Sequence, residues 1–107
     1  MLKKTVKVKR SSIHGRGVFA LKNIKAGELI GIFEGKITSR DGTHVLWLPD
    51  EDGNLYGIKG KNSLRYLNHS LVPNAEFNDE GELHAVLDIS PDEELTIHYG
   101  DEWIDTP

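Results

Sequence analysis

A run of polar side chains in the middle of the chain, from Arg65 to Asn74, has the composition of a ligand-binding turn. Arg65, Asn68 and His69 follow one another closely and together offer hydrogen-bond donors and acceptors. Beside a short helix, such a cluster could hold a polar cofactor through side-chain amides and backbone groups. The alternative is a polar turn whose hydrogen bonds are satisfied internally, and the spacing alone does not name a ligand.

A second candidate segment is Gly15-Arg16-Gly17, which leads into the apolar residues Val18 and Phe19. Because glycine has no Cβ, this pair permits a positive φ angle and a close approach of the backbone to a ligand. The alternative is an ordinary tight turn before a strand. No third glycine and no βαβ unit follows, so the segment is not a dinucleotide-binding fingerprint.

A third candidate is Tyr99, which stands just before Gly100 at the end of the apolar run that starts after Glu94. A tyrosine in this position either has a functional role in a site or packs as a half-buried core residue with its hydroxyl in water. A Ser-His-Asp triad is compatible with the composition, but the chain contains no nucleophile-elbow pattern.

Metal chemistry is not indicated. The chain has five histidines, and none has the paired spacing of metal ligands. It has no cysteine, which excludes disulfides, thiolate zinc sites and cysteine nucleophiles. We therefore predict a site without a metal.

The elements that must position these residues are short strands separated by glycine and aspartate turns. We predict a mainly β fold and one domain over residues 1–107, because the chain is long enough for one domain and too short for two. The only expected helix is short, at about Asn62 to Leu67, with Asn62 or Ser63 as its N-terminal cap. The predicted strands are Thr5–Lys9, Leu29–Phe33, Val45–Leu48, Leu55–Ile58, Leu83–Ile89 and Leu95–Tyr99.

The charges are unevenly distributed along the chain. All 13 lysines and arginines lie between Lys3 and Arg65, whereas residues from Glu76 to Asp105 include 11 acids and no basic residue. Either this is a solvated acidic tail, or it faces a basic substrate and attracts it. No basic stripe with interleaved aromatics indicates nucleic acid, and no apolar run approaches the length of a membrane span. We expect a cytoplasmic protein that binds neither nucleic acid nor membrane.

Taken together and in this order, the three candidate segments resemble the SET-domain family of protein-lysine methyltransferases. The matching residues are 15–20, 65–74 and 94–100, and the likeness extends over roughly Val6 to Trp103. It implies a SET-domain (β-clip-like) fold of small sheets with one or two short helices. In that fold the C-terminal part tucks beneath a loop as a pseudoknot, an exception to the usual avoidance of threading.

The resemblance also implies S-adenosylmethionine as methyl donor and a lysine in a basic protein or peptide as acceptor. Tyr99 matches the catalytic tyrosine, and Tyr56 resembles the tyrosine that lines the lysine channel. A narrow channel with tyrosines would disfavour the charged form of a lysine, whose pKa is ordinarily about 10.4. The cofactor-binding residues implied by the resemblance are Gly15, Arg16, Gly17, Arg65, Asn68, His69, Tyr99 and Trp103.

The sequence departs from the family pattern at several positions. His98 stands where an acid is common, Leu71 stands where many members have cysteine, and the cysteine-rich flanking segments are missing. This bare core is typical of a bacterial or viral member. Either Trp103 or the second subunit of a homodimer would have to close the lysine channel. A catalytically inactive SET-fold module that binds a basic peptide remains the alternative, and an unrelated small β domain is the third reading.

Overall fold

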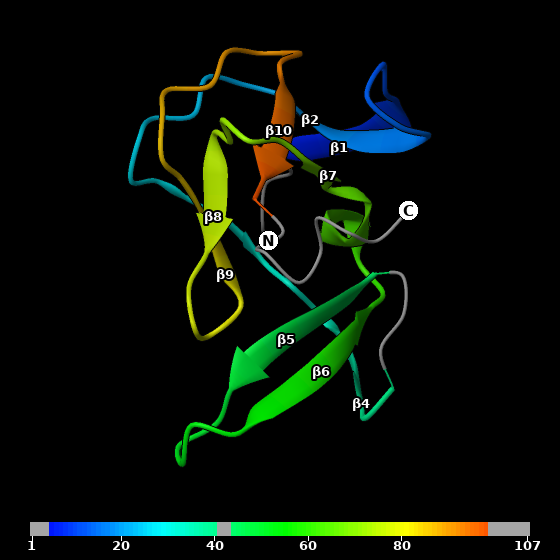
Figure 1. Cartoon of the computed structure of the whole chain (residues 1–107). Coiled ribbons are helices and arrows are strands. Elements are labelled where there is room, and N and C mark those ends of the chain that lie inside the picture. Colours follow the sequence, from blue (N-terminus) through cyan, green and yellow to red (C-terminus); the bar gives the residue numbers. More distant parts are fainter. Residues whose placement is uncertain (1–4, 41–43, 99–107) are drawn as a thin grey trace.

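The computed structural model describes residues 5–40 and 44–98, and this part of the chain is built mainly from short β-strands. The strands form three small sheets, and one short 3-10 helix lies at the side of the molecule (Figure 1). The predicted mainly β architecture of small sheets is therefore confirmed. None of the helical residues in the described part forms a stretch long and apolar enough to cross a bilayer.

The first sheet contains β1 (Val6–Arg10), β2 (Arg16–Ala20), β10 (Glu94–Ile97) and β7 (Asn68–His69), in the order β1-β2-β10-β7. β1 and β2 form an antiparallel hairpin. β10 pairs antiparallel with β2 and parallel with β7. β10, the last strand among the described residues, thus lies between two earlier segments, β2 and β7 (Figure 1). Passage of the C-terminal part beneath a loop concerns later residues and stays a prediction.

Two further three-stranded sheets complete the architecture. One has the order β3-β9-β8 and contains β3 (Leu29–Ile32), β9 (Glu82–Ala85) and β8 (Ala75–Phe77). The other has the order β4-β6-β5 and contains β4 (Gly35–Thr38), β6 (Leu55–Gly60) and β5 (Val45–Pro49). The β5–β6 hairpin extends away from the first sheet in Figure 1.

The core lies between the first and second sheets. Its most deeply buried large side chains are Ile24, Leu83, Ile89, Leu95 and Val18. Leu95 and Val18 face each other across the β10–β2 pairing, so β10 contributes directly to the core. Leu46 and Ile58 of the third sheet pack against the same cluster while remaining partly exposed. Burial of these apolar groups is what holds the small sheets together.

Several predicted elements have different limits in the structure. The predicted strand Leu83–Ile89 ends at Ala85, and Ile89 instead makes an isolated bridge with Ile24. The predicted helix is a 3-10 helix, η1 (Ser63–Tyr66). Asn62 stands at its N-cap, but the Asn62 side chain donates to the carbonyl of Ile32 (2.7 Å) and makes no cap hydrogen bond.

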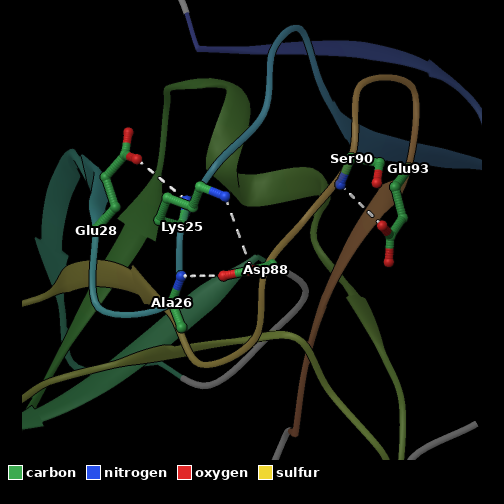
Figure 2. A network of polar contacts seen from close by, with 6 residues as sticks. All are labelled: Lys25, Ala26, Glu28, Asp88, Ser90 and Glu93. Atoms are coloured by element: carbon green, nitrogen blue, oxygen red, sulfur yellow. Dashed lines mark hydrogen bonds and ion pairs between the residues drawn. The ribbon is translucent and has the colours of Figure 1, made fainter.

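After the early end of β9, the chain makes a contact with the distant turn around Lys25 and Ala26. Asp88 Oδ1 accepts a hydrogen bond from the backbone N–H of Ala26 (2.9 Å), and Asp88 Oδ2 lies 4.0 Å from Lys25 Nζ (Figure 2). Glu28 accepts from the backbone N–H of Lys25 (3.2 Å), and this hydrogen bond lowers the pKa of Glu28. Asp88 therefore joins two loops and is not part of a strand.

Asn74 fastens β10 to the loop that precedes β8. Its side chain is buried, its Nδ2 donates to the Glu94 carbonyl (2.9 Å), and its Oδ1 accepts from the Thr96 N–H (2.9 Å). The Asn74 carbonyl also accepts from the N–H of Val86 (2.9 Å). The Asn74 side-chain amide thus makes two hydrogen bonds to the backbone of β10, as a neighbouring strand would.

We predict that Asn74→Ala destabilises the fold, because it leaves the Glu94 carbonyl and the Thr96 N–H buried without their partner. The expected loss in the free energy of unfolding is about 2–4 kcal/mol. Urea denaturation checks it, with the exposed Asn23→Ala as the matched control. Equal denaturation midpoints for the two variants would contradict the role assigned to Asn74.

A surface ion pair joins β1 to the turn before β10. Lys7 Nζ lies 2.6 Å from Asp92 Oδ1, and Lys9 Nζ lies 4.0 Å from the same oxygen. The hydrogen bond from Lys7 and the charges of both lysines lower the pKa of Asp92. Because the folded state lowers this pKa, ionised Asp92 stabilises the fold at pH values above its ordinary value of 3.8.

We predict that Asp92→Asn lowers the free energy of unfolding slightly at neutral pH, since exposed ion pairs contribute little. The difference from the wild type should shrink as the pH falls below 3.8 and through the lowered pKa of folded Asp92. Denaturant melts across this pH range measure it, with the exposed Asp52→Asn as control. A difference that grows on acidification would contradict the assignment.

Candidate active site

The side-chain amide of Asn68 lies where the three candidate segments meet. Asn68 begins β7 and is only 6% exposed. Its Nδ2 donates to the carbonyls of His14 (3.1 Å) and Arg16 (3.1 Å) and to Glu94 Oε2 (2.9 Å). One amide group therefore connects β7, the segment that enters β2, and the first residue of β10.

The carboxylate of Glu94 extends this network to the turn between β1 and β2. Ser11 Oγ lies 2.8 Å from both Glu94 oxygens and donates to the carboxylate. The same hydroxyl oxygen accepts from the N–H of Ile13 (2.9 Å). Ser11 also closes the turn through its backbone, since its N–H donates to the Gly15 carbonyl (2.7 Å). The shape of this turn is thus coupled to β10.

The two glycines of the turn serve different purposes. Gly15 has a φ of +46°, a left-handed conformation that glycine adopts without strain. Gly17 is buried, and a Cβ at this position would overlap Glu94 Oε2. The positive φ is present at Gly15, whereas a close approach of this backbone to a ligand stays a prediction. The group that approaches Gly17 is a carboxylate of the chain itself, which also supports the reading as a tight internal turn.

His69 lies beside the end of β10. The parallel register pairs Ile97 with His69, and the rings of His69 and His98 pack edge to face with centroids 4.9 Å apart. His98, which stands where an acid is common in the family, therefore contacts a predicted cofactor residue. The N–H of Ser70 donates to the Ile97 carbonyl (2.9 Å) and continues the pairing beyond β7.

Arg65 is engaged mainly with its own helix. Its Nη1 donates to the carbonyls of Lys61 (2.6 Å) and Asn62 (2.9 Å), and its Nη2 donates to Tyr66 Oη (2.8 Å). The exposed Arg16 guanidinium carbon lies 5.9 Å from the centroid of the Tyr66 ring. Tyr66 thus links two predicted cofactor residues, a role that its position in the sequence did not indicate.

Tyr56 lies in a different part of the molecule. It lines an open groove together with Pro49, Asp50, Glu51, Gly53, Asp79 and Glu80. None of these residues is a predicted cofactor residue, so the described residues do not join Tyr56 to the Asn68 site. Its role in a lysine channel stays a prediction. Tyr99 and Trp103 lie outside the described residues, and their roles stay predictions too.

Ser11 and Glu94 are the site residues that sequence reasoning missed. Glu94 belonged to a recognised segment but had no assigned role, and Ser11 had none either. They are 83 residues apart, so no local pattern connects them. Within the described residues, no three histidine or acidic side chains gather as a metal-binding group.

Comparison with known proteins gives a consistent result. The model of the SET domain matches residues 15–100. "Histone-lysine N-methyltransferase, H3 lysine-4 specific" of Emericella nidulans is 31% identical over 118 residues, which cover 91% of this chain and 10% of that protein. Human "Histone-lysine N-methyltransferase 2B" is 32% identical over 121 residues, which cover 91% of this chain and 4% of that protein. The chain spans about a tenth or less of the length of these relatives.

Solved structures support the same fold. The methyltransferase domain of human SETMAR superposes with a TM-score of 0.78 at 22% identity, covering 97% of this chain and 47% of that chain. The methyltransferase domain of human PR domain-containing protein 2 gives a TM-score of 0.73 at 22% identity, covering 99% of this chain and 82% of that chain. These similarities show the fold and leave the activity to be argued from the site.

We predict that Gly17→Ala lowers the free energy of unfolding by about 1–3 kcal/mol, because the added methyl group displaces the Glu94 carboxylate. Gly31→Ala is the matched control in another strand, since its Cβ would meet Leu64 Cδ1 at an ordinary 3.5 Å. Thermal and urea melts of both variants measure the difference. Equal stability of the two variants would show that the space at Gly17 is not limiting.

Proposed function

The chain belongs to the SET-domain family, and we propose that it transfers a methyl group from S-adenosylmethionine to the side-chain amine of a lysine in a protein substrate. The observation that carries this proposal is the meeting of three motif segments around Asn68. Gly15–Gly17, Asn68–His69 and β10 come from distant parts of the sequence and join in one sheet. A site assembled in this way can hold a donor and an acceptor on different sides.

The chemistry of the available groups fits S-adenosylmethionine, which carries a carboxylate, an ammonium and a polar nucleoside. Arg16 offers an exposed positive charge for a carboxylate. Backbone groups of Gly15–Gly17, with Asn68 and His69, would supply donors and acceptors to the remainder. When bound, this cofactor supplies a methyl group on a positively charged sulfur.

The residues around the substrate lysine would control the protonation and the orientation of its amine. A lysine amine attacks the methyl carbon only as the neutral base, whereas its ordinary pKa of about 10.4 keeps it charged in water. Tyr56 and an apolar surrounding would favour the neutral amine. Tyr99 would orient the lone pair in line with the carbon–sulfur bond. We assign closure of this channel to Trp103, with a second subunit as the alternative.

A basic protein segment is the proposed substrate class. The fungal relatives are named for lysine 4 of histone H3, and a lysine-rich segment of that chemical kind suits the acidic C-terminal part of this chain. The groove beside Tyr56 supports this choice, since Asp50, Glu51, Asp79 and Glu80 line it. A cytoplasmic location is part of the proposal and accords with the absence of cysteine.

A non-catalytic module that binds basic peptides is the second candidate. The observation that favours it is His98, whose imidazole packs on His69 at a position where an acid is common in the family. Binding of S-adenosylmethionine separates the two candidates, because a module of this kind has no need of a methyl donor.

We predict that the protein binds S-adenosylmethionine in a calorimeter and transfers its labelled methyl group to lysines in a mixture of basic proteins. Tyr99→Phe should reduce transfer by about 100-fold, since one positioned hydroxyl contributes that order of rate enhancement. Cofactor affinity should change far less than transfer in this variant, because the other cofactor-binding residues are intact. Absence of cofactor binding would favour the non-catalytic module, and cofactor binding without transfer to any lysine would count against the methyltransferase. Full activity of Tyr99→Phe would exclude a role for Tyr99 in the reaction.

A further inference from the structure

We propose that Glu94 is a positioning residue for the cofactor, whose carboxylate fixes the Asn68 amide and the Gly15–Gly17 segment relative to each other. The inference rests on the proposed function, because these two groups are the expected cofactor contacts. It assigns Glu94 a role through its neighbours and no direct contact with the reacting atoms.

The surroundings of the Glu94 carboxylate are neutral hydrogen-bond donors. None of the ion pairs found among residues 5–40 and 44–98 involves Glu94. Its oxygens accept from the Ser11 hydroxyl (2.8 Å) and from the Asn68 amide (2.9 Å) instead. A charged acceptor strengthens both hydrogen bonds relative to neutral pairs. The carboxylate is thus committed to two segments that are expected to contact the cofactor or to shape its binding turn.

The Glu94 carboxylate also contributes to the orientation of the Asn68 amide. It accepts hydrogen bonds and donates none, so it requires the NH₂ side of Asn68. A flipped amide would place Oδ1 against the Glu94 carboxylate and the carbonyls of His14 and Arg16, where every neighbouring atom is an acceptor. Glu94 and the two backbone carbonyls together keep the carbonyl side of Asn68 turned away from this cluster.

The backbone around Glu94 is held firmly enough to transmit this constraint. The adjacent Leu95 is fully buried and pairs with Val18, and Glu94 itself pairs with Phe19. Gly17 leaves the space that the carboxylate occupies. The Glu94 side chain therefore contacts Ser11 and Asn68 from a backbone position that strand pairing and the buried Leu95 hold in place.

The preceding residue provides a matched control. Glu93 is exposed, and its Oε1 accepts from the backbone N–H of Ser90 (3.0 Å) within a surface turn (Figure 2). Glu93 and Glu94 thus have the same chemistry and adjacent positions but different surroundings. Of the two side chains, that of Glu94 contacts Asn68 and Ser11, whereas that of Glu93 bonds within its own turn.

The test compares S-adenosylmethionine binding and methyl transfer for the wild type, Glu94→Ala, Glu94→Gln and Glu93→Ala. Glu94→Ala should weaken cofactor binding at least about tenfold, which corresponds to ~1.4 kcal/mol. Glu94→Gln should recover part of this loss, because its carbonyl oxygen still accepts from Asn68. Glu93→Ala should bind like the wild type. At saturating cofactor, kcat should change less than the KM for cofactor, which a general loss of folding would not produce.

The outcomes are distinguishable. Absence of binding by the wild type would overturn the proposed function, and the inference with it. Equal binding by wild type and Glu94→Ala, or a loss in kcat with an unchanged cofactor KM, would overturn the inference alone. If Glu94→Ala does not fold, Ser11→Ala removes one donor to the carboxylate while Glu94 remains. It should weaken cofactor binding severalfold, and wild-type affinity in that variant would overturn the inference.

Discussion

The architecture depends on a strand that is hydrogen-bonded along both of its edges. This strand is β10, which pairs with β2 through Glu94 and Leu95 and with β7 through Thr96 and Ile97. Buried backbone N–H and C=O groups need partners, and the inserted strand supplies them to two segments that lie far apart in the sequence. The Asn74 side chain adds two more hydrogen bonds, and the buried Leu95 ties the strand to the core.

The strands that carry a clear apolar face could be predicted from the sequence. The predicted strands Leu29–Phe33, Val45–Leu48 and Leu55–Ile58 are rich in apolar residues and lie between turn residues. The structure forms strands at Leu29–Ile32, Val45–Pro49 and Leu55–Gly60. The strands β4 and β8 could not, because β4 is mostly exposed, β8 has only three residues, and partner strands stabilise both. Asp88, which follows the early end of β9, contacts a distant turn, and no local pattern reveals that contact.

The candidate site was predictable where a residue type itself carries the information. A glycine pair, an Asn-His pair and a terminal tyrosine indicate a backbone approach, an amide contact and a hydroxyl, and the structure joins Gly15, Gly17 and Asn68 in one network. The link between Ser11 and Glu94 was not predictable, because serine and glutamate are ordinary surface residues at most positions. Their importance arises from the tertiary pairing of β10 with β2.

The central place of β10 has a consequence for the order of folding. During synthesis, β1, β2 and β7 leave the ribosome before β10 exists, so their sheet has a vacant central position. The Ser11–Glu94 contact spans 83 residues, and contacts of such separation form slowly because the loop between them must first be closed. During synthesis the contact between Asn68 and Glu94 therefore cannot form until nearly all of the described chain has been made.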